Sequence, residues 1–393
     1  MKVLYTGAFR FPDKDAASQR VLNNGKILKK LGYDVSFLGW ENKEREEDLN
    51  AEKKYVYEGF EYNSMNELDI LNTSVLSKIS NYYQRGNKTL KYIENNYKNI
   101  NIIIIYNSNY LFVNRMIKFC RINKIKLIID STEWYESEHL PGGKYGIPSI
   151  DNFLRMKVAN VKAQNVIVIS TFLKKFYDSN ACKTLLLPPL IDIKEKKWQI
   201  TNNIRSYNDD IKIIYAGDPG RKDILGDVIK TVEIFNKTSQ KKITFNILGI
   251  DENKLLNILQ MYKLPDNVNC LGRVEMHLVP KFYSENHFSI LIREDKRYAH
   301  AGFSTKFVES LCSGIPVIAN CTSDISTYIE DGNNGFILED GSIGNILKMF
   351  TKLENLSPSQ YQDLSSNAKL SGVQYFDFNN YIITTNLFFK GLL

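Results

Sequence analysis

The stretch Ala301-Gly-Phe-Ser-Thr-Lys-Phe-Val-Glu-Ser-Leu-Cys-Ser-Gly-Ile-Pro-Val-Ile-Ala319 decides the fold. It predicts a loop, a helix of about two to three turns, and a short buried strand at residues 317–319. Ser304 can cap the helix through its hydroxyl, with Phe303 and Val308 at the spacing of a hydrophobic staple. Gly314 and Pro316 supply the stop signal. A helix that runs so directly into an apolar strand is typical of an α/β protein.

Lys306 lies in the first turn of this helix, where the helix dipole disfavours a cation. A bound anion such as a phosphate group would explain that placement. Glu309 shares a helix face with Lys306 and Thr305, and its carboxylate could accept two hydrogen bonds from a ribose diol. The alternative is an ordinary surface helix that carries a Lys–Glu pair.

Strands and helices alternate on both sides of a polar connection at residues 194–210. This alternation predicts two parallel-sheet domains with a boundary near residue 190. The first has strands at 2–6, 35–38, 102–106, 126–130 and 166–169, with helices at 16–31, 73–97, 111–123 and from 171. The second has strands at 212–216, 244–248 and 288–292, with helices at 227–235 and 253–261. We expect domains at 1–190 and 191–374.

The opening segment resembles the donor-nucleotide motif of GT-B glycosyltransferases, especially the retaining glycosyltransferase family four (group 1). Gly302, Phe303, Glu309, Gly314, Pro316 and Val317 match that motif. The resemblance implies a GT-B fold: two Rossmann-like domains that face each other across a cleft, with residues 375–393 packing back on the first. It also implies that amides at Phe303, Ser304 and Thr305 hold the donor diphosphate and that Glu309 holds the ribose. Ala301 replaces the family's first Glu, which lies beside the transferred sugar.

A second group of candidate residues follows other predicted strands of the second domain. Gly217, Arg221 and Lys222 form a glycine-rich turn with two cations, which suits a diphosphate, although a solvated turn looks the same. Lys222 is the preferred ligand and Arg221 the second. By resemblance, Gly249 and Arg273 flank the nucleobase. Arg293 ends an apolar strand, so it is expected to point into the ligand crevice and act on a phosphate or the donor sugar.

In the first domain, Gly7 matches the loop that meets the diphosphate and acceptor in the family, and Arg20 matches an Arg at the first helix. Asp130 and Glu133 follow a strand, where the family has a polar pair near the reacting sugar. Either carboxylate could orient a sugar hydroxyl or the acceptor. His139 is expected to be a loop residue.

Net charge is divided unevenly between the two halves. The chain carries +7, of which residues 1–190 contribute +8 and residues 191–393 contribute −1. The basic half favours an anionic partner, and an anionic membrane leaflet is preferred over nucleic acid because no nucleic-acid motif is present. Basic segments at 78–98 and 115–126 could lie on such a membrane or pack as ordinary helices.

Cysteines and histidines argue against a metal site. Five scattered cysteines indicate reduced thiols, and four histidines have no ligand spacing. No run of residues is long and apolar enough for a membrane span, and the first residues form a strand pattern, so a cytoplasmic protein is expected, peripheral to the inner face of the plasma membrane.

These patterns predict a retaining, metal-independent glycosyltransferase without a cofactor. Its donor is expected to be a UDP-linked hexose or N-acetylhexosamine, and its acceptor a glycan or lipid-linked saccharide in bacterial surface polysaccharide synthesis. Two other functions fit the same fold, namely a nucleotide-sugar epimerase and a non-catalytic binding module.

Overall fold

The computed structural model describes residues 1–40, 43–67, 75–199, 207, 210–220 and 222–392. The chain divides into two compact units. Unit 1 comprises Met1–Ile191 together with Phe378–Leu393, and unit 2 comprises Asp192–Asp377. Within the described part of the chain, no helix is both long and apolar enough to cross a membrane.

Unit 1 is built on an eight-stranded sheet in the order β3-β4-β2-β1-β5-β6-β7-β8. Neighbouring strands are parallel except β3 and β4. All five residues of β5 are buried, as expected of a central parallel strand covered on both faces. The strands are β1 (Lys2–Gly7), β2 (Asp34–Gly39), β3 (Val56–Tyr57), β4 (Phe60–Ser64), β5 (Ile102–Tyr106), β6 (Lys126–Ser131), β7 (Asn165–Val168) and β8 (Lys183–Leu186).

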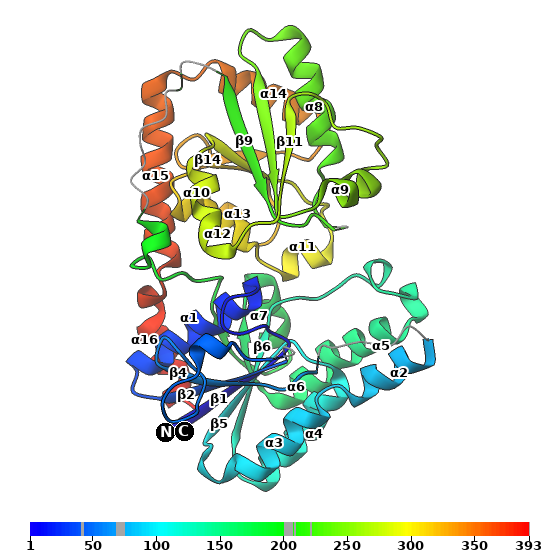
Figure 1. Cartoon of the computed structure of the whole chain (residues 1–393), viewed down its shortest axis with the longest axis vertical. Helices are drawn as coiled ribbons and strands as arrows, with labels where there is room; N and C mark the ends of the chain where they lie inside the picture. The colour runs from blue at the N-terminus through cyan, green and yellow to red at the C-terminus, as the bar shows by residue number, and fades with distance from the viewer. Residues whose placement is uncertain (41–42, 68–74, 200–206, 208–209, 221, 393) are drawn as a thin grey trace. The chain divides into compact units, whose positions relative to one another are not determined.

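Helices cover both faces of this sheet (Figure 1). On one face α16 packs against α1, and the ring of Tyr33, three residues after α1, lies 5.5 Å from that of Phe389. On the other, α3, α5 and α6 pack against α4. The helices are α1 (Ala16–Lys30), α2 (Val75–Gln84), α3 (Asn87–Asn96), α4 (Tyr110–Ile122), α5 (Ile147–Leu154), α6 (Asn160–Ala163), α7 (Thr171–Asp178) and α16 (Ile382–Lys390).

Two sequence expectations for unit 1 need correction. The single helix predicted at 73–97 is two helices, α2 and α3, because Gly86 between them has a φ of +93°, which no helix accommodates. Its first two residues lie outside the described ones. No helix was expected between Asp130 and Val166, yet α5, a π-helical turn (Arg155–Ala159) and α6 run there without a break.

Unit 2 has a six-stranded sheet, entirely parallel, in the order β11-β10-β9-β12-β13-β14. Helices α8 and α14 pack together, as do α12 and α15. The strands are β9 (Ile211–Ala216), β10 (Ile243–Leu248), β11 (Val268–Gly272), β12 (Phe288–Leu291), β13 (Val317–Asn320) and β14 (Gly335–Leu338). The helices are α8 (Gly226–Thr238), α9 (Glu252–Leu259), α10 (Val279–Ser284), α11 (Arg297–Ala301), α12 (Thr305–Cys312), α13 (Ile325–Tyr328), α14 (Ile343–Glu354) and α15 (Pro358–Phe376).

Candidate functional site

Strand order reverses between β9 and β12, which creates a topological switch point in unit 2. In open α/β sheets, ligands bind beyond the carboxyl ends of the strands at such a point. Gly217 follows β9, and Arg293 lies two residues after β12. The site described below is therefore placed by the topology of the sheet.

The start of α12 has no side-chain cap. Ser304 occupies the N-cap position with extended backbone, but its hydroxyl makes no hydrogen bond to the helix. The Ser304 side chain is buried, and its Oγ has no partner among the described residues. The capping bond expected from the sequence is thus absent. The first-turn amides of α12, which have no carbonyl partners within the helix, are left able to bind an anion.

Phe303 helps to fix this helix start. Its ring contacts Phe307 at 5.6 Å and Tyr328 at 5.5 Å, so the expected staple with Val308 is replaced by an aromatic cluster. Gly302, which ends α11, brings the backbone from that helix into this turn. Phe303 therefore contributes its backbone to the site while its side chain packs into the core.

Lys306 reaches away from the helix axis into a charged cluster. Its Nζ lies 2.5 Å from Asp223 Oδ2 and 2.5 Å from the Tyr215 hydroxyl. Arg293 Nε donates to the other oxygen, Asp223 Oδ1, at 2.7 Å. Tyr215 also donates to Asp223. Lys306 and Arg293 were each predicted to act directly on a ligand, and the structure shows that both also share one carboxylate.

The cluster holds two cations against one carboxylate, and all three side chains are largely buried. Burial by itself would raise the pKa of Asp223, but Lys306 and Arg293 outweigh it and hold that pKa well below its ordinary value. Burial lowers the pKa of Lys306, and Asp223 offsets part of that effect. With all three groups ionised, the cluster carries one excess positive charge, which a bound anion would neutralise.

Gly217 allows the Lys306 side chain to pass directly over the end of β9. A Cβ at Gly217 would lie 2.3 Å from Lys306 Cε, and the residue has a φ of +136°, which only glycine adopts easily. The Gly249 amide donates to the Gly272 carbonyl at 2.7 Å, and a Cβ on Gly249 would lie 2.9 Å from Gly217. These strand ends therefore converge around Lys306.

The other predicted cations of unit 2 differ in their surroundings. The carbonyl of Lys222, next to Asp223, accepts a hydrogen bond from the Tyr298 hydroxyl at 2.8 Å. Arg221 lies outside the described residues. Asp218 stands where the family has an Arg and forms an ion pair with Lys254. Arg273 is exposed, and its charge helps to lower the pKa of Asp218.

Glu309 lies one turn along α12 from the cluster. Burial raises the pKa of its carboxyl to about 7, although Lys197 and Lys306 act in the opposite direction. Its carboxylate accepts no hydrogen bond from any described residue, so its acceptor capacity is available to a ligand hydroxyl. Thr305, the first residue of α12, shares this region.

In unit 1 the structure gives Asp130 a different role from the predicted one. Its side chain is fully buried, Arg20 binds it at 2.8–3.1 Å, and the Tyr5 hydroxyl donates to it at 2.5 Å. Arg20 Nη1 also donates to the Leu187 carbonyl at 2.8 Å. Because both carboxylate oxygens are used, Asp130 stabilises the unit and is not placed to contact a sugar.

Glu133 and Gly7 lie close to that ion pair. Burial raises the pKa of Tyr106, and the negative charge of Glu133 raises it further. Glu133 therefore lies near Tyr106, at the end of β5. Gly7 ends β1 beside Tyr106, and its register partner on β2 is Gly39. His139 ends a short 3₁₀ turn, as expected of a loop residue.

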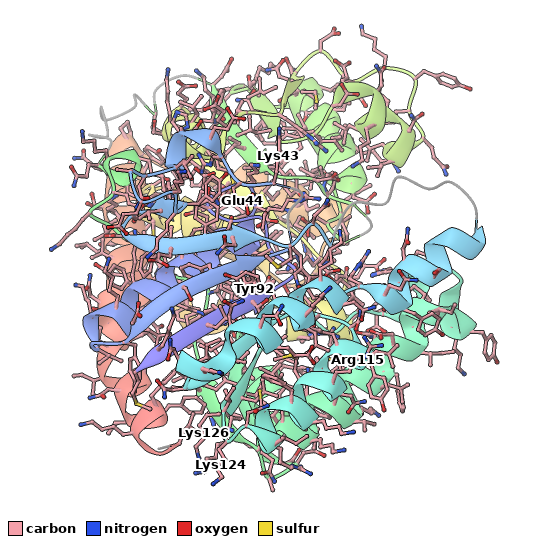
Figure 2. All side chains as sticks on the ribbon, turned by 60° about the horizontal axis from the view of Figure 1, so that its bottom comes forward. Lys43, Glu44, Tyr92, Arg115, Lys124 and Lys126 are labelled. Atoms are coloured by element: carbon pink, nitrogen blue, oxygen red, sulfur yellow. The ribbon has the colours of Figure 1, made fainter. Side chains whose placement is uncertain are left out.

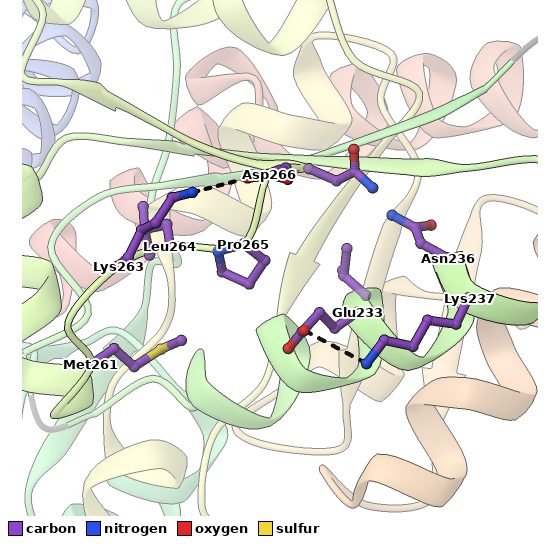
Figure 3. A pocket seen from close by; sticks show the side chains of 10 residues that line it. Glu233, Asn236, Lys237, Met261, Lys263, Leu264, Pro265 and Asp266 are labelled. Carbon is purple, nitrogen blue, oxygen red and sulfur yellow. Dashed lines mark hydrogen bonds and ion pairs between the residues drawn. The ribbon is translucent and has the colours of Figure 1, made fainter.

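A hollow of about 490 Å³ opens elsewhere on unit 2 (Figure 3). It is lined by the second half of α8 and by residues 261–267, just before β11 begins. This is the amino end of the sheet, opposite to the switch point, and no predicted site residue lines it. Among the described residues no group of three or more His, Cys, Asp or Glu side chains could hold a metal ion.

Comparisons with known proteins concern the family and the fold. The family model described as glycosyl transferases group 1 matches residues 196–371, which lie within unit 2. An uncharacterized glycosyltransferase from Haemophilus influenzae is 25% identical over 128 residues, which is 32% of this chain and 34% of that protein. The chain therefore matches about a third of the length of this curated relative.

Solved structures similar to this one extend over its whole length. Sucrose-phosphate synthase from Thermosynechococcus elongatus has a TM-score of 0.76 at 12% identity and covers 100% of this chain and 98% of its own. HepE from Anabaena, in complex with UDP and glucose, has a TM-score of 0.66 at 13% identity and covers 98% and 99%. Similarity at this level of identity establishes the fold. The GT-B fold and the resemblance to group 1 glycosyltransferases are thus both confirmed.

Proposed function

We propose that this chain is a retaining glycosyltransferase that moves a hexose or N-acetylhexosamine from a UDP-sugar to a hydroxyl of a glycan or lipid-linked saccharide, in the synthesis of a bacterial surface polysaccharide. One observation carries the proposal. Two largely buried cations share a single carboxylate beside a helix start where the Ser304 hydroxyl has no partner among the described residues, and where the first amides have no carbonyl partner within the helix. That arrangement suits a diphosphate, and the UDP in the Anabaena structure makes UDP the first ligand to test.

The chemistry required of this site is stabilisation of a leaving group. As the bond between the anomeric carbon and the diphosphate oxygen breaks, its electron pair stays on the phosphate. The acceptor oxygen bonds to the same carbon, and its proton passes to the departing phosphate. The α12 amides, Ser304 and the excess charge of the Lys306 cluster would stabilise the negative charge that develops on the nucleoside diphosphate.

Donor recognition would be divided between two parts of α12. The first turn would hold the diphosphate, and Glu309 would accept hydrogen bonds from the ribose hydroxyls. Ala301 is fully buried in α11 and offers no polar group, so the transferred sugar must be held by other residues.

Ser304→Ala tests the proposal at the level of binding. Because Ser304 Oγ bonds to no described residue, its removal should leave thermal stability unchanged or slightly higher. A hydrogen bond to a charged group contributes about 1.5–3 kcal/mol, so UDP affinity measured by calorimetry should fall at least about tenfold. Ser313→Ala is the control, since that hydroxyl bonds to the Glu309 carbonyl at the other end of α12. Equal UDP affinity in Ser304→Ala and wild type contradicts the diphosphate assignment.

Turnover separates the proposed activity from its alternatives. A transferase should release UDP from UDP-sugars, and faster when saccharide acceptors are added. Isomerised UDP-sugar without acceptor would identify an epimerase. Tight UDP binding without turnover of any donor would identify a binding module.

A further inference from the structure

The segment of unit 1 from residue 144 to residue 162, here called the α5 segment, exposes apolar side chains where an ordinary surface helix exposes polar ones. Its exposed side carries large apolar residues, with relative exposures of 85% for Tyr145, 51% for Ile150, 52% for Phe153 and 41% for Val158. Ile150, Phe153 and Lys157 follow one another at the i, i+3, i+7 spacing of one helix face. A surface helix normally turns its polar residues outward, so this face lacks an expected cover.

The side of the segment that faces the unit carries several polar side chains beside the buried Met156 and Ala159. Asn152 donates to the Tyr135 carbonyl at 3.1 Å, and Asn160 donates to the Tyr177 hydroxyl at 2.9 Å. Arg155 donates to Asn152 Oδ1 at 3.2 Å. These buried bonds fix which side of the segment faces inward. The outward position of the apolar residues is therefore set by the fold.

The π-helical turn Arg155–Ala159 widens the exposed face. It leaves two successive residues, Lys157 and Val158, exposed, whereas Arg155 and Met156 are buried. Such turns are rare and occur frequently at functional sites. The ammonium of Lys157 lies over the Phe153 ring at 5.1 Å, so cation and apolar surface form one patch.

The loop before α5 displays Tyr145. The loop is ordered by hydrogen bonds, because Ser149 Oγ donates to the Gly143 carbonyl at 2.6 Å and the Gly146 amide donates to the same carbonyl at 3.1 Å. The ammonium of Lys144 lies 6.0 Å from the centre of the Tyr145 ring. Tyrosine beside lysine is a pairing suited to the boundary between water and lipid.

Charge on this face has one sign. Between Pro141 and Gln164, the exposed charged residues are Lys144, Lys157 and Lys162, all of them cationic. Asp151, the acid within that range, turns inward and accepts from the Tyr110 amide at 2.9 Å. Glu138, in the turn before the loop, is the nearest exposed acid along the chain.

We propose that the face formed by Tyr145, Ile150, Phe153 and Val158 with Lys144, Lys157 and Lys162 docks on a bilayer that contains anionic lipid. An apolar face flanked by lysines enters the headgroup boundary, while the ammonium groups stay with the lipid phosphates. A bilayer with anionic headgroups offers an apolar layer with continuous negative charge over it, which matches this face. This surface does not depend on the proposed sugar transfer.

The basic helices singled out from the sequence are poorer candidates. On α4 the apolar residues Phe112, Met116 and Cys120 are buried, whereas Arg115 is exposed. In Figure 2 Lys124 and Lys126 lie together and well apart from Arg115. The described residues of α3 likewise turn Ile93 inward. These helices have basic solvated faces and bury most of their apolar residues in the unit, although Ile122 at the end of α4 is 68% exposed.

Sedimentation with vesicles tests the proposal on the full chain. Wild type should bind vesicles of phosphatidylcholine with phosphatidylglycerol, should bind phosphatidylcholine alone far less, and should be released as salt screens the charges. Ile150→Ser with Phe153→Ser should weaken partitioning at least tenfold. Each lysine near an anionic surface strengthens partitioning onto the membrane roughly fivefold. The triple variant Lys144→Gln, Lys157→Gln, Lys162→Gln should therefore bind the vesicles roughly 100-fold more weakly than wild type.

Two control sets match these variants. Ile383→Ser with Leu387→Ser removes two apolar side chains of α16 that are 74% and 66% exposed. Lys118→Gln, Arg121→Gln and Lys124→Gln remove three charges from the α4 region. Both sets should bind vesicles as wild type does, with circular dichroism confirming that every variant is folded.

Several outcomes would overturn the proposal. They are absence of vesicle binding, equal binding to neutral vesicles, and an equal loss of binding in the α4 set. A dimer in solution that Ile150→Ser with Phe153→Ser dissociates would assign the face to a second copy of the chain instead.

Discussion

Asp223→Asn should destabilise unit 2 substantially. Asp223 is the single carboxylate between Lys306 Nζ, at 2.5 Å, and Arg293 Nε, at 2.7 Å. The Asn side chain keeps the size and one acceptor oxygen but removes the negative charge. Two cations would then remain buried side by side.

The magnitude follows from the exposure of the three side chains. Removing one partner of a fully buried ion pair costs about 3–5 kcal/mol. The Asp223 side chain is 2% exposed, whereas Arg293 is 13% and Lys306 is 19% exposed, so water can reach both cations. We therefore expect a loss at the low end, about 3 kcal/mol.

Urea unfolding at neutral pH measures this loss if it reports on unit 2 alone, because a chain with two units need not unfold in one step. The chain has three tryptophans, and Trp198 is the one in unit 2. Fluorescence in a Trp40→Phe, Trp134→Phe background therefore follows that unit. Asp227→Asn is the control, since this exposed carboxylate lies 3.8 Å from Lys230 and should contribute less than about 0.5 kcal/mol.

Stability measured at low pH tests the same ion pairs a second time. The pKa of Asp223 is lowered in the folded state, so its stabilisation is present above the unfolded pKa of about 3.9 and is lost as pH falls below that value. The difference between wild type and Asp223→Asn should therefore shrink in acid. UDP should also raise the stability of Asp223→Asn more than that of wild type, because its diphosphate replaces the missing charge. A variant within about 1 kcal/mol of the Asp227→Asn control would refute the reasoning.

Three other predictions concern Arg20, Glu309 and Ala301. Arg20→Ala leaves Asp130 buried and unpaired, so chemical unfolding should show unit 1 destabilised by about 3–5 kcal/mol, and a loss below 1 kcal/mol would contradict the buried pair. Burial raises the pKa of Glu309 to about 7, so wild type loses stability as pH rises from about 4.3 to 7. The melting temperature of Glu309→Gln should therefore rise relative to that of wild type between pH 5 and pH 8. A difference in melting temperature that stays constant with pH would show that Lys197 and Lys306 fully compensate the burial of Glu309. Ala301→Glu buries a carboxylate and should lower the melting temperature, whereas Ala301→Ser should change it little; equal melting points for Ala301→Glu and wild type would show room for the family's Glu.

Local pattern was sufficient for the parallel α/β class of both units, although it did not predict the short strands β3, β4 and β8 of unit 1 or β11 and β14 of unit 2. Continuous apolar runs such as residues 102–106 indicate strands covered on both faces, and glycines at strand ends with helix starts behind them indicate parallel α/β units. The start of α12 at Ser304, and therefore the position of the proposed nucleotide site in the chain, follows from residues within one turn of each other. These features depend on short-range backbone preference and periodicity, which the sequence records directly.

Tertiary structure alone decided which charges meet and which faces are buried. Asp223 pairs with Lys306 across 83 residues and with Arg293 across 70, and Arg20 finds Asp130 across 110. No periodicity encodes such pairs, because they depend on where separate strands end in space and on how far burial strengthens a charge interaction. The α5 face is a similar case. No element was predicted there from the sequence, and its apolar residues lie outside because buried asparagines and Arg155 bind the interior on the opposite side.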